Sequence, residues 1–272
     1  MSLNVWTSPD DVIRKEIIIH GKSELKPTEN CKCYIRVTDT SIGELHKFAQ
    51  TYLYVLGNSD TAIERNLDNC LMYMLIGEVA RVTFHLEVIC SFTLELLNFE
   101  TEDLIYNWSV EKKLSLALNH KTRGVELFKE CRYIDASHRF SKGLMILCSL
   151  PIGVNEFVTE VDNISLKDIQ NLKVNLYNNL ASCYLKCFDY QTVLKLCQKV
   201  FEIDKENIKA LYKEGVAFYE LQDYEKSQGS LMTLLNIDSD NKAALEKLKF
   251  VNIKVNESNV KVNAMIKKMF SK

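Results

Sequence analysis

Three lysines and an asparagine that follow residue 110 could together bind a carboxylate. Lys209 and Lys213 are four residues apart, so in a helix they project from the same face. Asn179 lies 34 residues before Lys213, and Lys121 lies three residues before Gly124. Lysine ammonium groups form charge-assisted hydrogen bonds to carboxylates, and an asparagine amide can bond to a carboxylate or to a peptide backbone. These residue types predict a site for an acidic peptide, provided that the fold brings the four side chains together.

A repeated pattern of small and aromatic residues supplies the framework for these side chains. The segments 178–190 (NNLASCYLKCFDY) and 212–224 (YKEGVAFYELQDY) begin 34 residues apart and match at their small, aromatic and Asp-Tyr positions. An earlier copy has Gly124 where the other two have Ala181 and Gly215. The small residue lets two helices approach, and the aromatic residues fill the space beside it. A helix-turn-helix unit of 34 residues with this arrangement is the tetratricopeptide (TPR) repeat.

Three TPR repeats and a final helix are expected within a domain that spans 111–272. The repeats are predicted over 117–150, 174–207 and 208–241, and a capping helix over 242–270. The second copy begins 57 residues after the first, so about 23 residues are inserted, which we expect to lengthen the flanking helices around a loop. Because the first helices of stacked repeats line one concave groove, the predicted site residues face that groove together. They are Lys121, Asn179, Lys209 and Lys213.

The first hundred residues have a different periodicity, typical of strands around one helix. Short β-branched or aromatic runs occur in VIRKEIIIHG, CKCYIRVTD, TYLYVLG, EVARVTFHLEV and SFTLELLNFE. Between the third and fourth runs, Ile63, Leu67, Leu71 and Leu75 recur every four residues and predict one helical face. We expect Gly77 to end this helix. The chain as a whole is therefore predicted to have an α+β fold, with an antiparallel sheet and one helix followed by an all-α superhelix.

Composition and charge argue against several classes of function. Residues 1–110 contain 9 basic and 16 acidic residues, whereas residues 111–272 contain 25 basic and 20 acidic residues. The basic half lacks a dense stripe of Lys and Arg interleaved with aromatic residues, so nucleic-acid binding is not favoured. No run of eighteen apolar residues occurs, so no membrane span is predicted.

The cysteines and histidines give no indication of a metal centre. Nine scattered cysteines form no C-x-x-C pair, and the five histidines have no metal-like spacing. We expect Cys31, Cys33, Cys183 and Cys187 to be buried, reduced thiols. An odd number of cysteines without a visible signal peptide predicts a cytoplasmic location, or a nuclear one. Phosphate-binding and nucleophile-elbow motifs are also absent, so no cofactor is expected.

Two stretches of the first half resemble an FKBP domain, the fold of a class of prolyl isomerases. Residues 5–37 resemble its opening strands, and residues 54–84 resemble its central helix with the M-x-x-G-E-x-A strand that follows. An FKBP domain followed by three TPR repeats is similar to the FKBP-TPR immunophilin co-chaperones, and in particular to their divergent FKBP-like members. The resemblance covers nearly the whole chain and implies a degenerate FKBP-like domain over 1–104.

In that family, a carboxylate clamp in the TPR groove holds the acidic C-terminal tail of heat-shock protein 90 or heat-shock protein 70. The resemblance carries the clamp over to Lys121, Asn179 and Lys209, which match the family's pattern. Val125 stands where the first repeat usually has an asparagine, and Lys213 stands where arginine is usual. Lysine keeps the charge of arginine but loses its bidentate geometry, so a working but weaker clamp is implied.

The resemblance also implies that prolyl isomerisation has been lost. TDTSIGELHKFAQTYL replaces the strand that carries F-D-S-S in active domains, and the tryptophan of the pocket floor aligns near Asn66 or Leu67, beside Ile63. The Tyr-bearing loop before the last strand is reduced to a few residues near HLEVICSF. We therefore expect a non-enzymatic adaptor that brings an unknown client protein to a chaperone. Two alternatives stay open: an active peptidyl-prolyl isomerase, and a TPR scaffold for another partner, for example in a germline small-RNA pathway.

Overall fold

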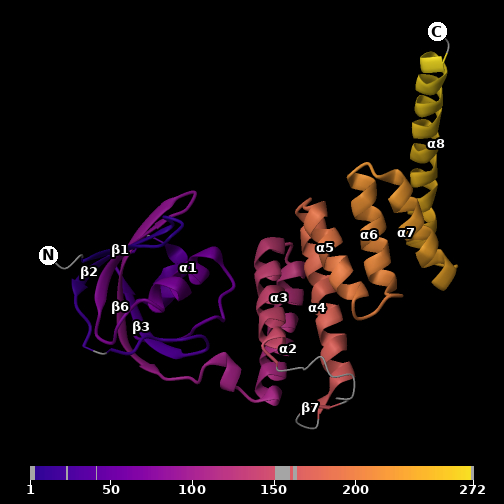
Figure 1. Cartoon of the computed structure of the whole chain (residues 1–272). Coiled ribbons are helices and arrows are strands. Elements are labelled where there is room, and N and C mark those ends of the chain that lie inside the picture. Colours follow the sequence, from indigo (N-terminus) through magenta and orange to yellow (C-terminus); the bar gives the residue numbers. More distant parts are fainter. Residues whose placement is uncertain (1–3, 23, 41, 151–159, 162–163, 271–272) are drawn as a thin grey trace. The chain divides into compact units, whose positions relative to one another are not determined.

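The chain folds into a sheet-containing unit followed by a helical unit, which confirms the predicted α+β fold (Figure 1). The computed structural model describes residues 4–22, 24–40, 42–150, 160–161 and 164–270. The two compact units are Met1–Trp108 and Ser109–Lys272. Among the described residues, no helix is both long enough and apolar enough to cross a membrane.

The first unit is built on a six-stranded antiparallel sheet with the strand order β1-β2-β5-β6-β3-β4. Alternate residues of β3 and β5 are buried, as a sheet with one covered face requires. Helix α1 (Ala62–Leu71) and the 3-10 helix η1 (Gly43–Phe48) contribute side chains to the same core. The strands are β1 (Val5–Thr7), β2 (Ile13–Ile19), β3 (Lys32–Thr38), β4 (Tyr52–Val55), β5 (Val79–His85) and β6 (Ile89–Glu100).

Helix α1 ends six residues before Gly77, the residue predicted to end it. A buried ion pair explains the difference. The ammonium of Lys15 donates to the carbonyl of Tyr73 at 2.6 Å and to the carboxylate of Glu78 at 2.7 Å, and the Leu75 N–H donates to the same carboxylate at 3.0 Å. The carbonyl of Tyr73 and the N–H of Leu75 are therefore engaged by side chains, and a longer helix would need them for its own backbone hydrogen bonds.

Side chains of η1 and α1 fill the space between the helix and the sheet. Leu45 and Phe48 of η1 are buried, and so is Leu67 of α1. Ile63 is half-buried against the same core. The connection between β5 and β6 contains only residues 86–88, so it is as short as the sequence predicts.

In its described residues, the second unit consists of three helix-turn-helix pairs and a final helix, which is the TPR arrangement (Figure 1). Glycine is required where the paired helices approach, because a Cβ on Gly124 would lie 2.6 Å from the ring of Phe140. A Cβ on Gly215 would lie 2.8 Å from Leu231. The helices are α2 (Val110–Lys129) with α3 (Tyr133–Cys148), α4 (Leu166–Lys186) with α5 (Tyr190–Phe201), α6 (Ile208–Glu220) with α7 (Tyr224–Ile237), and α8 (Lys242–Phe270).

The inserted segment lengthens the first helix of the second repeat, as predicted, but the prediction that it also lengthens the second helix of the first repeat is wrong, because α3 ends at Cys148, before the insertion. Helix α4 has 21 residues, whereas α6 has 13. Before α4, the short strands β7 (Glu160–Val161) and β8 (Ile164–Ser165) pair with each other. Residues 151–159 and 162–163 of the insertion lie outside the described residues. The 3-10 helix η2 (Ile105–Asn107) precedes the second unit.

Three of the four cysteines expected in the core are buried, namely Cys31, Cys33 and Cys183. The prediction for Cys187 is wrong, because its side chain is exposed. Cys187 follows the last residue of α4 and lies beyond the part of the helix that packs against its neighbours.

Candidate functional site

A cavity of about 410 Å³ is lined by the first helices of the repeats and by the start of α8. Its walls are largely apolar and include Phe128 of α2, Leu185 of α4, and Ile208 and Tyr212 of α6. Three lysines also line it: Lys186, Lys209 and Lys213. No acidic side chain among the described residues contributes to its lining. A cavity of this composition is complementary to a ligand that combines anionic groups with an apolar part.

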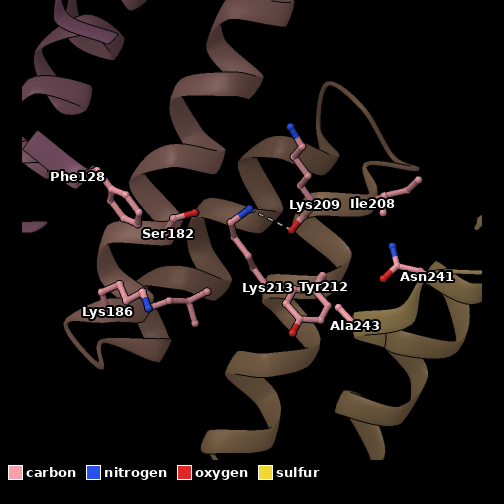
Figure 2. A pocket seen from close by; sticks show the side chains of 10 residues that line it. Phe128, Ser182, Lys186, Ile208, Lys209, Tyr212, Lys213, Asn241 and Ala243 are labelled. Carbon is pink, nitrogen blue, oxygen red and sulfur yellow. Dashed lines mark hydrogen bonds between the residues drawn. The ribbon is translucent and has the colours of Figure 1, made fainter. Parts of the chain in front are cut away.

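Lys213 lies between the walls of the cavity and is held by two hydrogen bonds (Figure 2). Its ammonium donates to Oδ1 of Asn178 at 3.0 Å and to the carbonyl of Lys209 at 3.2 Å. The buried Asn178 in turn donates to Oδ1 of Asn207, the N-cap residue of α6, at 3.1 Å. Burial lowers the pKa of Lys213 to about 8, an effect that Cys197 opposes and Lys209 reinforces. The ammonium is therefore fixed in place and only partly hydrated.

Lys186 and Lys209 differ from Lys213 in being exposed. Neither ammonium has an acidic partner among the described residues. Their donors are available to a ligand, and no existing ion pair has to break first.

Two of the predicted site residues do not line this cavity. Lys121 is half-buried on α2, seven residues before Phe128 and so on the same helix face. Asn179 is half-buried on α4, directly after Asn178. The structure thus brings Lys209 and Lys213 into the cavity and leaves Lys121 and Asn179 on the helices that form its walls.

Asn178 and Lys186 belong to the site although the comparison of repeats does not find them. The 34-residue spacing aligns Lys213 with Asn179 rather than with Asn178. Asn178 lies three residues before the buried Ala181, on the apolar face of its helix. A single polar residue on such a face is the one feature of the sequence that could have indicated a hydrogen-bonding role for Asn178. Lys186 aligns with a glutamate in the third repeat, so the spacing gave no indication of its role.

The sequence is similar over nearly its whole length to mammalian proteins. FK506-binding protein-like from Mus musculus is 28% identical over 271 residues, which cover 98% of this chain and 74% of the mouse protein. The Homo sapiens protein of the same name is 27% identical over 98% of this chain and 73% of its own length. The chain is a homologue of the FK506-binding protein-like proteins. No protein-family model matches the sequence.

Two solved structures also resemble this chain. The C-terminal TPR-containing domain of a Plasmodium falciparum FK506-binding protein has a TM-score of 0.51 and 29% identity, and the match covers 57% of this chain and 99% of that domain. The crystal structure of residues 1–211 of CG17282 has a TM-score of 0.58 over 70% of this chain and 96% of the other. At 20% identity, this second likeness concerns the fold alone.

Proposed function

We propose that this FK506-binding protein-like homologue is a non-enzymatic co-chaperone whose TPR groove binds the acidic C-terminal tail of heat-shock protein 90, or of heat-shock protein 70. The observation that carries the proposal is the cavity to which α2, α4 and α6 contribute. Its walls are largely apolar and contain three lysines, and no acidic side chain among the described residues lines it. A chain end with a terminal carboxylate and acidic side chains is complementary to that lining.

The fixed position of Lys213 suits it to bind the terminal carboxylate. Two hydrogen bonds engage its ammonium, and a third donor is left for a ligand. Lys209, one helical turn away, supplies a second ammonium. Lys121 and Asn179 bind the tail farther along the groove. The FKBP-like unit contacts the client or another partner, without catalysis.

Capture of heat-shock protein 90 tests the proposal. The immobilised full chain is incubated with the purified chaperone and, separately, with the same chaperone lacking its last five residues. We expect retention of the intact chaperone only, and its release by a free tail peptide. Equal retention of the truncated chaperone would overturn the proposed tail binding and favour a TPR scaffold for another surface.

We expect the full chain to leave the isomerisation rate of a proline-containing peptide unchanged. Leu45, Phe48 and Leu67 fill the region between helix and sheet, and the three-residue connection after β5 leaves no long loop to cover a substrate. A protease-coupled isomerisation assay measures the rate. Acceleration above the uncatalysed rate that is lost in an Ile63→Ala variant would contradict this expectation and favour the alternative of an active isomerase.

Tail binding is expected to weaken about tenfold between pH 7 and pH 9. The tail binds only when the Lys213 side chain is protonated, and the protonated fraction of the chain falls as the pH rises. The pKa of Lys213 is lowered to about 8, so the ammonium is charged below that pH and neutral above it. The affinity for the tail therefore falls as the pH rises. Anisotropy titrations with an N-acylated tail peptide measure it. Lys213→Arg is the control, since arginine stays charged and should flatten the pH dependence; an unchanged profile in that variant would contradict the assignment to Lys213.

A further inference from the structure

A carboxyl group is buried in the first unit without a basic partner. Asp68 lies on α1, and the residue is 7% exposed. Its carboxylate accepts a hydrogen bond from the hydroxyl of Tyr54 in β4 at 2.7 Å, and it is also bonded to the side chain of Ser59 and to the N–H of Gly57. All three donors are neutral, and no Lys, Arg or His of the described chain bonds to this carboxylate. A carboxyl group in such surroundings is costly to keep charged.

These bonds attach α1 to the loop that precedes it, residues 56–61, which we call the β4–α1 loop. Ser59 and Gly57 both belong to this loop, and Ser59 is buried like Asp68. Gly57 has a positive φ of 81°, and it lies against the carboxylate of Glu29, because a Cβ on Gly57 would be 1.8 Å from Oε1 of Glu29. The loop therefore contacts two carboxyl groups. Opening the loop would break two of the bonds to Asp68 and would admit water to its carboxyl group.

The surroundings of Asp68 favour its protonated form while the loop is closed. Burial raises the pKa of Asp68 from its ordinary 3.8 to about 6. The three hydrogen bonds lower the pKa and so offset part of this effect, whereas the negative charge of Glu29 raises it further. Cys33 of β3 also interacts with Asp68, but burial raises the pKa of the Cys33 thiol to about 12, so the thiol stays neutral near pH 6.

We propose that Asp68 is a pH-sensitive latch on the β4–α1 loop, which opens more readily as the pH rises from 5 to 7. Water restores the ordinary proton affinity of the carboxyl group once the loop is open, so the closed loop binds the proton more tightly than the open loop does. Protonation therefore stabilises the closed loop, and this stabilisation is lost as the pH rises through the pKa of Asp68, about 6. The inference concerns the first unit alone and does not depend on tail binding.

Hydrogen exchange of the full chain measures how readily the loop opens, when it is followed by mass spectrometry of a fragment that contains residues 56–61. Exchange rates at pH 5 and pH 7 are divided by those of the unfolded chain at the same pH. We expect this corrected rate to rise about tenfold in the wild type, the ratio that a pKa of 3.8 in the open loop and about 6 in the closed loop gives. Asp68→Asn cannot titrate at this position but retains Asp60 and Glu64, and its corrected rate should be the same at both pH values.

Asp11→Asn is the matched control. Asp11 is exposed between β1 and β2 and has a positive φ of 57°, which asparagine also tolerates, so the same change from carboxyl to amide should leave the rise as it is in the wild type. A corrected rate that does not rise in the wild type would overturn the inference, and so would an undiminished rise in Asp68→Asn.

Tyr54→Phe tests the latch with Asp68 in place. It removes the hydrogen bond that does most to favour the charged carboxylate, so the rise between pH 5 and pH 7 should be larger than in the wild type. If Asp68→Asn does not fold, this variant decides. A rise in Tyr54→Phe that is no larger than that of the wild type would contradict the role given to Asp68.

Discussion

Changing Lys209 to glutamate is expected to weaken the binding of an acidic tail peptide by roughly a hundredfold. Lys209 lines the cavity with its ammonium exposed and without an acidic partner among the described residues. Loss of a hydrogen bond to a charged group costs about 1.5–3 kcal/mol, or roughly ten- to a hundredfold in affinity, and a glutamate adds repulsion toward the tail. The adjacent Lys213 does not compensate, because two of its donors are already engaged.

Fluorescence anisotropy at one fixed ionic strength measures this effect, since salt screens such contacts. The matched control is Lys195→Glu, which makes the same change of charge on α5, the second helix of its repeat. Lys195 is exposed and does not line the cavity, so its reversal should change affinity only slightly. Equal losses in the two variants would mean that the net charge of the unit, rather than the cavity, attracts the peptide.

Glu78→Gln is expected to destabilise the first unit by about 3–5 kcal/mol, the usual cost of leaving one partner of a buried ion pair charged and alone. Both side chains of the Lys15–Glu78 pair are 3% exposed, and the N–O distance is 2.7 Å. The pair also holds the chain after α1, through the carbonyl of Tyr73 and the N–H of Leu75. Lys15→Met combined with Glu78→Gln should recover much of the loss, because no unpaired charge then remains buried.

Denaturant unfolding followed by tryptophan fluorescence measures these values. Both tryptophans of the chain, Trp6 and Trp108, lie in the first unit, so their emission reports that unit. Glu16→Gln is the control, because the Arg14–Glu16 pair has exposed side chains and such pairs contribute about 1 kcal/mol or less. A loss for Glu78→Gln no larger than that for Glu16→Gln would contradict the role given to the buried pair.

The fold could be predicted where it depends on local periodicity. Gly124 and Gly215 occupy the close approaches of paired helices, and their spacing relative to the aromatic residues identifies the repeats. The end of α1 could not be predicted in this way. It depends on a contact between Lys15 and Glu78, which are 63 residues apart and meet only once the sheet has formed.

The site could be predicted in part for the same reason. Lys209 and Lys213 are on one helix, so a spacing of four residues is enough to place them together. The bond from Lys213 to Asn178 joins two repeats, and it depends on how α4 is rotated against α6. A difference of one residue along α4 separates Asn178 from Asn179, and the alignment of repeats cannot resolve that rotation.

Calorimetric titration of the full chain with one acidic tail decapeptide, prepared with a free C-terminal carboxylate and as the C-terminal amide, tests tail binding most directly. The two peptides differ only in the group that Lys209 and Lys213 are proposed to hold. Carboxylate binding predicts a Kd of about 10 μM for the free acid and a value at least about tenfold weaker for the amide, which lacks the charge-assisted bonds. Equal affinities for the two peptides would contradict it.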